Sequence, residues 1–126
     1  VCGDRDKVVT VVGCGGDRDR AKRPVMAAIA VSMSRATILT SDNPRSEDPM
    51  AIIDEMRLGI LSADGARVFV NVDRREAIRQ AVAMTKPGDV VLVAGKGHEN
   101  YQEVRGERHH FDDAEVLKET LELMHK

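Results

Sequence analysis

The stretch Val8-Val9-Thr10-Val11-Val12, followed by Gly13-Cys14-Gly15-Gly16, is the part of the sequence that decides the fold. Its apolar residues are continuous and mostly β-branched, which is typical of a strand that is covered on both faces in a parallel sheet. The glycines after it allow a tight turn, and the start of a helix beyond such a turn favours anions. Three more continuous apolar runs occur, at residues 36–39, 68–70 and 90–93.

Helical patterns separate these apolar runs. Residues 22–34 predict a first helix, with an apolar stripe made of Met26, Ile29, Ala30 and Met33. A second helix is predicted to have Asp48 as its N-cap, to carry Pro49 at its first position and to end at Gly59. The residues expected to face inward from this second helix are Met50, Ile53 and Met56.

The last part of the chain predicts two more helices and a hairpin. Asp73 and Glu76 resemble a capping box that opens a helix running to about Thr85. Residues 101–104 and 108–111 are expected to form a hairpin, and Asp112 or Asp113 then caps a final helix. This order predicts one α/β domain over residues 1–126, with a Rossmann-like, doubly wound, mainly parallel sheet and flanking helices. The C-terminal hairpin is expected to add an antiparallel edge.

Composition excludes several classes of function. The 126 residues contain 19 Lys and Arg against 21 Asp and Glu, so the chain lacks the basic surplus that nucleic-acid binding requires. No apolar run approaches the roughly 20 residues of a membrane span, so no membrane partner is expected. The charged residues at positions 4–7 do not suit a signal peptide, and a cytoplasmic chain with reduced thiols is the simplest interpretation. Cys2 and Cys14 do not have the spacing of metal ligands, so no metal site is expected in this chain.

Polar residues gather after three of the predicted strands, at residues 13–19, 41–45 and 95–99. Parallel strands bring these loops to one edge of the sheet, where ligands of such folds bind. The first loop is not a dinucleotide fingerprint because Arg18 stands where the third glycine belongs, and Gly95-Lys96 is not part of a P-loop. The sequence therefore predicts no triphosphate cradle.

The charges of these loops are mixed. Three cations and three carboxylates are involved: Arg18, Arg45, Lys96, Asp17, Asp42 and Glu99. Arginine forks grip carboxylates and a carboxylate suits an ammonium group, so the mixture favours an amino acid as the ligand over a nucleotide. Simpler interpretations remain open, since Arg45 can pair with Glu47 or Asp48 at the surface, and Asp42 and Asn43 suit an ordinary turn.

Four segments carry a specific resemblance: GCGGDRDRAKRPVM at 13–26, TSDNPRSEDP at 40–49, AGKGHENYQ at 94–102 and HHFDDAE at 109–115. In this order they resemble the C-terminal domain of the Mur ligases, and within that family the members that add meso-diaminopimelate. The resemblance implies a cytoplasmic, ATP-dependent ligase of peptidoglycan precursor synthesis that forms an amide through an acyl phosphate. It also implies that UDP-sugar and central ATPase domains, absent from this chain, precede it as partners, and that the central domain holds most of the ATP and Mg²⁺.

The resemblance also implies a set of ligand contacts. The residues that would bind meso-diaminopimelate are Arg18, Asp42, Asn43, Pro44, Arg45, Gly95 and Glu99. Asp17 would approach ATP, and no catalytic residue is expected in this domain. The other small-molecule partner would be the UDP-N-acetylmuramoyl dipeptide. Two alternatives remain: an L-lysine-adding ligase of the same family, and a non-catalytic α/β module that binds an amino acid or a nucleotide.

Overall fold

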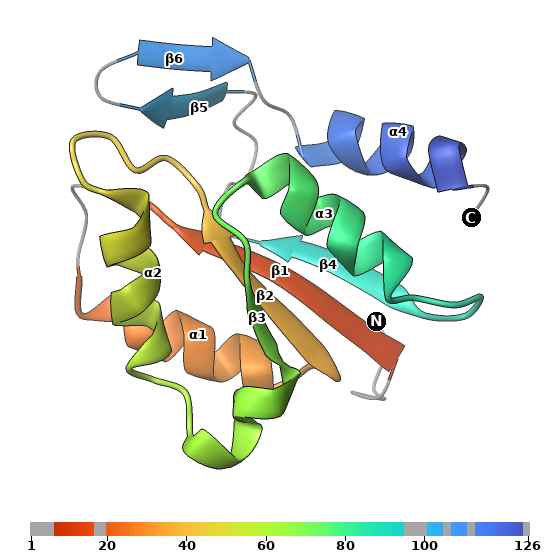
Figure 1. The fold of residues 1–126 in the computed structure, drawn as a ribbon, viewed down its shortest axis with the longest axis horizontal. Coiled ribbons are helices and arrows are strands. Elements are labelled where there is room, and N and C mark those ends of the chain that lie inside the picture. The colour runs from red at the N-terminus through yellow and green to blue at the C-terminus, as the bar shows by residue number, and fades with distance from the viewer. Residues whose placement is uncertain (1–6, 17–19, 95–100, 105–106, 111–112, 125–126) are drawn as a thin grey trace.

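The structure is a computed structural model that describes residues 7–16, 20–94, 101–104, 107–110 and 113–124. Four parallel strands form its main sheet in the order β3-β2-β1-β4 (Figure 1). Their bounds are Val8–Cys14 for β1, Ala36–Ser41 for β2, Val68–Val70 for β3 and Val90–Ala94 for β4. All four apolar runs singled out in the sequence are therefore strands, and the parallel arrangement is confirmed.

Helices connect the strands. Their bounds are Lys22–Ser32 for α1, Pro49–Arg57 for α2, Arg74–Ala83 for α3 and Asp113–Met124 for α4, with a short 3₁₀ segment, η2, at Ser62–Arg67. β1 lies between β2 and β4, with Val9 opposite both Ala36 and Val91. Every residue of β1 and β2 is buried, which explains why their sequences do not alternate between apolar and polar residues.

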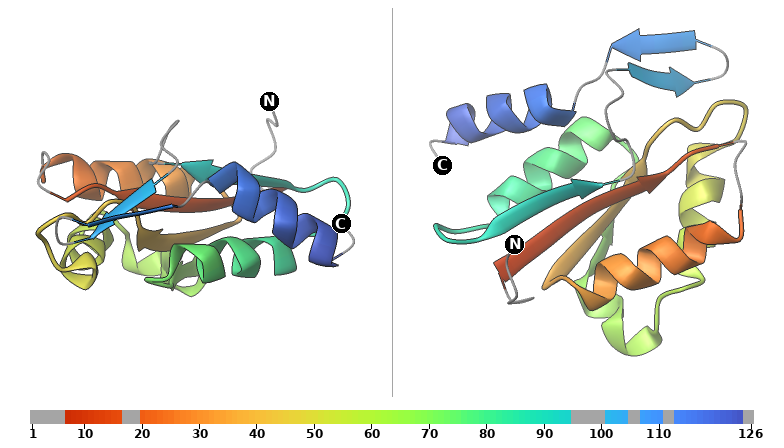
Figure 2. Two further views of the ribbon diagram at one scale, coloured as in Figure 1. Left: turned by 90° about the horizontal axis from the view of Figure 1, so that it is seen from above. Right: turned by 180° about the vertical axis from the view of Figure 1, so that it is seen from behind.

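Alternate residues of the strands face two separate cores, and α1 and α3 lie on opposite faces of the sheet (Figure 2). One core joins β1 and β2 to α3 and α4, and its members include Val9, Val11, Ile38, Ala77, Ile78 and Val116. The other joins them to α1 and α2, and its members include Val12, Leu39, Ala27, Ile53 and Met56. The fold is therefore doubly wound, as the sequence predicts.

The inward face of α1 agrees with the prediction only in part, since Ala30 is buried and Met26 packs against the core, as expected. Ile29 and Met33 are about half exposed, at 53% and 51%, whereas Ala27 and Val31 are buried. The helix lies close to the sheet through small residues, because bulky side chains at these positions would hold it further away. Ile29 and Met33 line instead a groove of about 190 Å³ beside Leu92 of β4.

The caps of α2 and α3 form as expected. The Asp48 carboxylate accepts a hydrogen bond from the Met50 amide at 3.0 Å, and the Asp73 carboxylate accepts one from the Glu76 amide at 3.2 Å. Met50 is 39% exposed, so the prediction that it faces inward is wrong. It occupies the first turn of α2, where the chain has just left the solvent-exposed cap.

The C-terminal hairpin consists of β5, Tyr101–Val104, and β6, Glu107–His110, which pair in antiparallel fashion. In the described part of the chain it forms a two-stranded sheet of its own and is not hydrogen-bonded to β4. The hairpin is thus confirmed, but the antiparallel edge that it was expected to add to the main sheet is absent from these residues.

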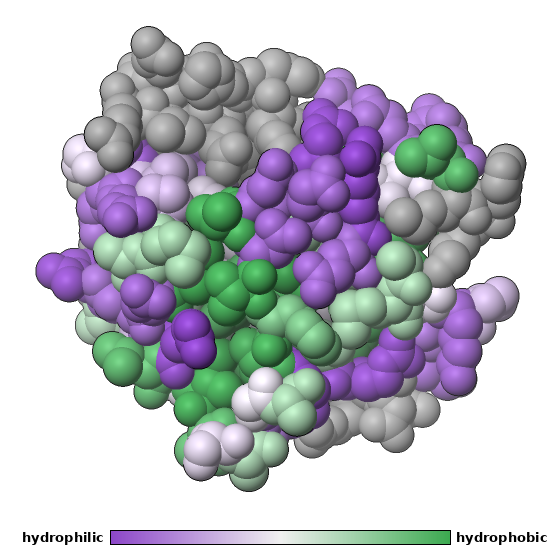
Figure 3. All heavy atoms as spheres, in the orientation of Figure 1, coloured by the Kyte–Doolittle hydropathy of each residue, from purple (hydrophilic) through white to green (hydrophobic). Residues whose placement is uncertain are grey.

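Apolar side chains are not confined to the two cores. Hydrophobic residues gather on one face over β3 and the segment after α2, beside the hydrophilic outer surface of α3 (Figure 3). Leu58 and Leu61, which follow α2, are 80% and 70% exposed. None of the helices described in the structure is long and apolar enough to cross a membrane.

Candidate functional site

The loop after β1 and the loop after β2 meet at the carboxyl edge of the sheet. The Gly16 amide donates a hydrogen bond to the Asn43 carbonyl at 2.7 Å. A Cβ atom on Gly16 would lie only 1.8 Å from the Pro44 carbonyl oxygen, so this position has no room for any side chain. The two loops predicted to share an edge therefore form one packed unit.

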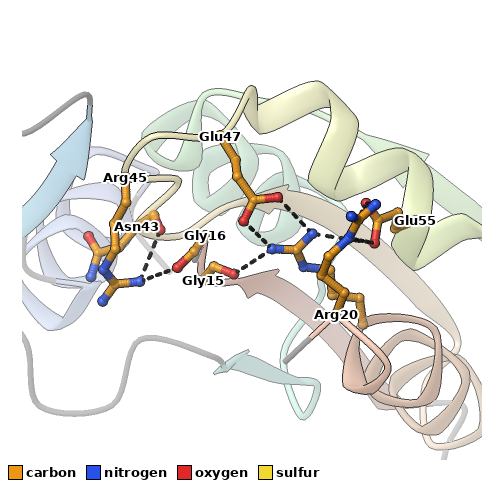
Figure 4. Close-up of polar contacts among 8 residues, drawn as sticks. Gly15, Gly16, Arg20, Asn43, Arg45, Glu47 and Glu55 are labelled. Atoms are coloured by element: carbon orange, nitrogen blue, oxygen red, sulfur yellow. Dashed lines mark hydrogen bonds and ion pairs between the residues drawn. The ribbon is translucent and has the colours of Figure 1, made fainter. Parts of the chain in front are cut away.

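Arg45 lies in the turn that follows this contact. It has a φ of 55°, the left-handed region that non-glycine residues seldom adopt, and the Glu47 amide closes the turn by donating to the Pro44 carbonyl at 3.0 Å. Its Nη1 atom donates to the carbonyls of Gly16 at 2.9 Å and Asn43 at 3.3 Å (Figure 4). The Nε–Nη2 edge of the guanidinium takes no acceptor among the residues that the structure describes.

The three residues before Arg45 are buried. Asp42 is 4% exposed and Asn43 is 1% exposed, and Pro44 packs against Gly16. Arg45 itself is half-buried. This part of the predicted site therefore offers a ligand mainly the Arg45 side chain, with Asp42, Asn43 and Pro44 shaping the turn beneath it.

Pairing of Arg45 with Glu47, which the sequence left open, does not occur, because Glu47 pairs with Arg23. Glu47 accepts hydrogen bonds from both terminal nitrogens of Arg23, at 2.7 and 3.1 Å, and Arg23 Nη2 also donates to the Gly15 carbonyl at 3.1 Å (Figure 4). Arg23 is 1% exposed, and its hydrogen bond with Glu47 raises its pKa, so it stays charged. It thus joins the glycine loop, through Gly15, to Glu47, two residues after Arg45.

Glu55 of α2 completes this network. It lies 3.4 Å from Arg23 and accepts two-pronged hydrogen bonds from Arg20, the shortest at 2.7 Å. The Arg20 guanidinium lowers the pKa of Glu55 below its usual range, since it binds the ionised form. The start of α1 is therefore tied to α2 by charges as well as by their shared core.

A second buried arginine lies beneath the other side of the site. Arg74, the first residue of α3, donates to the Ser41 carbonyl at 3.1 Å and to the Ala94 carbonyl at 3.3 Å. Sequence analysis did not single out Arg23 or Arg74. The spacing of residues along the helices could have indicated that both arginines are buried. Arg23 lies four residues before the buried Ala27, and Arg74 lies three residues before the buried Ala77, so each arginine shares the inward face of its helix.

Cys14 ends β1 next to these loops. Burial raises the pKa of its thiol to about 11, and Asp42 adds to the rise, although Arg23 opposes it. Its Sγ atom lies 3.8 Å from the Met26 sulfur within the α1 core. Cys14 therefore has a packing role, because a thiol held neutral in this way is a poor nucleophile.

The described residues do not fit a nucleotide or a metal ion. Pro44 of the same chain fills the space beside Gly16, and Gly15 and Gly16 direct their polar backbone groups to Arg23, Arg45 and Asn43. No group of three His, Cys, Asp or Glu side chains suited to a metal occurs among them. The other residues predicted for the site lie outside the described ranges: Asp17, Arg18, Gly95, Lys96 and Glu99.

Comparison with known proteins identifies the family. The model of the "Mur ligase, glutamate ligase domain" family matches residues 2–97, well over half of the chain. The chain belongs to the Mur ligase family. Ligases of this family depend on ATP and Mg²⁺ in general.

Individual relatives agree with this assignment. The chain is 52% identical to the UDP-N-acetylmuramoyl-L-alanyl-D-glutamate–2,6-diaminopimelate ligase of Cytophaga hutchinsonii, over 96% of the chain and 25% of that ligase. It is 56% identical to the ligase of the same name from Bacteroides thetaiotaomicron, over 91% of the chain and 24% of the relative. A solved structure of such a ligase superposes with a TM-score of 0.87 at 48% identity, covering 95% of this chain and 24% of that one. The chain thus spans about a quarter of the length of the Mur ligases that it matches.

Proposed function

We propose that residues 1–126 are the C-terminal, amino-acid-binding domain of an ATP-dependent ligase that adds meso-diaminopimelate to UDP-N-acetylmuramoyl-L-alanyl-D-glutamate. The names of the relatives at 52% and 56% identity support this assignment. The amine of the incoming amino acid attacks the activated D-glutamate carboxylate in peptidoglycan precursor synthesis, in the cytoplasm. The UDP-sugar and central ATPase domains lie outside this chain, and the central domain holds most of the ATP and Mg²⁺.

The observation that carries this proposal is the arrangement of Arg45. Its Nη1 atom is anchored to the Gly16 and Asn43 carbonyls, which fixes the plane of the guanidinium at the carboxyl edge of the sheet. The Nε–Nη2 edge has no acceptor in the described part of the chain. Such an edge matches the two oxygens of a carboxylate, and the hydrogen bonds are charge-assisted.

This arrangement discriminates between the two candidate amino acids. Meso-diaminopimelate is lysine with one additional carboxylate on its side-chain terminal carbon. A ligand carboxylate on Arg45 contributes roughly 1.5–3 kcal/mol, whereas lysine leaves the half-buried guanidinium without that acceptor. The difference corresponds to a selectivity of about ten- to 150-fold.

The remaining assignments rest on the family resemblance. Asn43 joins Arg45 at the distal end of the ligand, and Arg18 contacts a carboxylate as well. Gly95 and Glu99 take the distal ammonium, which an acidic side chain suits. Asp17 approaches ATP across the domain interface. The domain supplies no catalytic residue, and its contribution is to hold the amine close to the acyl phosphate, an orientation effect of several kcal/mol.

The test uses the full-length ligase that carries this chain, with release of ADP measured against meso-diaminopimelate and against L-lysine. Arg45→Gly is the informative variant because glycine accepts a φ of 55° without strain, so the turn keeps its shape and only the guanidinium is lost. We expect the KM for meso-diaminopimelate to rise about ten- to 150-fold while the KM for ATP stays within about twofold. The lysine reaction should change little.

Arg79→Ala serves as the matched control, since Arg79 is an exposed arginine whose partner Glu76 lies one turn away on the same helix. It should leave every KM unchanged. Turnover with L-lysine and none with meso-diaminopimelate would instead establish the lysine-adding ligase. Binding of an amino acid without any release of ADP by the full-length protein would establish the non-catalytic module.

A further inference from the structure

Arg74 connects three elements below the candidate site. Its side chain is 0% exposed. Nη1 donates to the carbonyl of Ser41, the last residue of β2, and Nη2 donates to the carbonyl of Ala94, the last residue of β4. Because these two strands are not neighbours in the sheet, the guanidinium spans the end of the strand between them.

That intervening strand is β1, and its sequence leaves room for the arginine. A Cβ atom on Gly13 would lie 2.9 Å from Arg74 Nη1 and about as close to the backbone of Ser41. Any larger residue at Gly13 would push the guanidinium away from the strand ends. The glycine after the first apolar run therefore accommodates a buried side chain, in addition to allowing a turn.

The charge of Arg74 is balanced by Asp113 at the start of α4. Nε and Nη2 donate to the two carboxylate oxygens of Asp113, each at 2.7 Å, in a parallel two-pronged pair. The pair fixes the orientation of the guanidinium plane, and that plane points its remaining donors at the two carbonyls. The buried arginine is thus fully engaged within the protein and does not itself reach a ligand.

We propose that Arg74 is a positioning residue that fixes the end of β2, and with it the Asn43–Arg45 turn, against β4 and α4. Ser41 directly precedes Asp42, so the carbonyl held by Arg74 lies four residues before Arg45. Binding of a ligand carboxylate depends on the position of the Arg45 guanidinium. A displacement of about 1 Å at such a group lowers the rate or the affinity by up to about a hundredfold. This inference rests on the proposed function for its kinetic consequence, although its structural consequence can be measured without substrate.

A purely structural role for Arg74 is the competing explanation, and Arg75 provides the comparison. Arg75 pairs with Glu119 at 3.1 Å, so it joins α3 to α4 as Arg74 does, but its side chain is 43% exposed. The hydrogen bond of Arg75 runs to Glu119 of α4, whereas the hydrogen bonds to the Ser41 and Ala94 carbonyls come from Arg74. Arg75→Met therefore weakens the contact between the helices and leaves the strand ends held.

The experiment compares Arg74→Lys with Arg75→Met in the full-length ligase. Lysine keeps the positive charge beside Asp113, but its single ammonium lacks the fork that reaches Asp113 and two carbonyls together. We expect Arg74→Lys to raise the KM for meso-diaminopimelate about ten- to a hundredfold, with the KM for ATP within about twofold of the unmodified enzyme. Arg75→Met should leave both values unchanged.

Hydrogen exchange provides the readout that needs no substrate. The amides of Gly16 and Glu47 report on the turn, since they are bonded to the Asn43 and Pro44 carbonyls. In Arg74→Lys they should exchange about tenfold faster or more, while the amides within β1 keep their protection. A uniform increase that includes β1 would show a purely structural role and overturn the proposal, as would an unchanged KM or the same effect in Arg75→Met.

A poorly folded Arg74→Lys would not leave the question open. Asp113→Asn keeps the shape of the carboxylate partner but removes one of its two acceptors, so it should give the same pattern at a smaller amplitude, and no change would overturn the proposal. If the unmodified ligase uses L-lysine and not meso-diaminopimelate, the proposed function fails separately. The inference about Arg74 is then decided by the exchange result alone, because Arg45 is not expected to contribute to the KM for L-lysine.

Discussion

Replacing Gly16 by alanine tests whether the glycine loop and the Arg45 turn act as one unit. The added Cβ atom would lie 1.8 Å from the Pro44 carbonyl oxygen and 2.4 Å from its carbon. Since real Cβ atoms keep at least about 3.0 Å from such atoms, the two loops must separate by roughly 1.2 Å. Both partners are backbone, so no side chain can rotate to relieve the contact.

This separation breaks two contacts. The Gly16 amide loses its hydrogen bond to the Asn43 carbonyl, which is 2.7 Å away in the unmodified protein. The Gly16 carbonyl loses its hydrogen bond from Arg45 Nη1, which is 2.9 Å away in the unmodified protein. A backbone hydrogen bond contributes about 1 kcal/mol, and the half-buried charged one contributes about as much after screening. We therefore expect a loss of about 2 kcal/mol in the free energy of unfolding of this domain, or roughly 5–10 °C in the Tm of the transition in which it unfolds. The shift of Arg45 should raise the KM for meso-diaminopimelate by up to about a hundredfold.

Thermal unfolding and steady-state kinetics of the full-length ligase measure these two effects. Gly65→Ala is the control, because a Cβ atom there meets nothing within 4 Å and the residue lies in η2, away from the site. It should leave the KM unchanged and Tm equal or slightly higher, since alanine reduces the entropy of the unfolded chain. If Gly16→Ala matches Gly65→Ala in both Tm and KM, the glycine loop and the Arg45 turn do not act as one unit.

Two further predictions concern stability. The Cys14 thiol has a pKa of about 11 in the folded chain against 9.0 as its ordinary value, so on raising the pH the unfolded state loses this proton first. The stability that the buried neutral thiol provides is complete below pH 9 and is lost between about pH 9 and 11. The measurement is the difference in unfolding free energy between the unmodified protein and Cys14→Ala, determined in urea at each pH. This difference should shrink between about pH 9 and 11 and stay constant below pH 9. Asp48→Ala removes the carboxylate that accepts from the Met50 amide and should cost about 1 kcal/mol by the same measurement, whereas Asp48→Asn, which still caps a helix, should cost little; equal losses would show that the cap is unimportant.

The strands were predictable because burial on both faces leaves a direct trace in the sequence. β1 and β2 are buried at every position, so their residues form unbroken apolar runs. Caps were predictable for a similar local reason, since Asp48 and Asp73 act on amides two and three residues away. Local chemistry of this kind requires no knowledge of the tertiary structure.

The face of α1 was not predictable from hydrophobicity alone. Ile29 and Met33 are more apolar than Ala27, yet Ala27 is the residue that contacts the sheet. How closely a helix approaches a sheet is decided by the size of the residues between them, and a scale of hydrophobicity ranks bulky residues first. The hairpin presents the same limit, because its own pairing is local whereas its attachment to β4 depends on the path of the chain.

One geometric prediction is confirmed: the loops after β1 and β2 meet at the carboxyl edge of the sheet. The hydrogen bonds of Gly16 with Asn43 and Arg45 demonstrate that contact. The two buried arginines were missed, because arginine in a charged, helical sequence is ordinarily a surface residue. The roles of the residues assigned to meso-diaminopimelate remain proposals.

The buried arginines explain how the site can reserve one guanidinium for a ligand. Arg23 and Arg74 stand at the first turns of α1 and α3, on opposite faces of the sheet, and both donate to backbone carbonyls at its carboxyl edge. Each is neutralised within the chain, Arg23 by Glu47 and Arg74 by Asp113. Because these arginines supply the structural hydrogen bonds and carry their own counter-ions, Arg45 needs only one of its nitrogens to hold its place. Its other edge then stays available for the ligand carboxylate that we propose it binds, the group that meso-diaminopimelate has and lysine lacks.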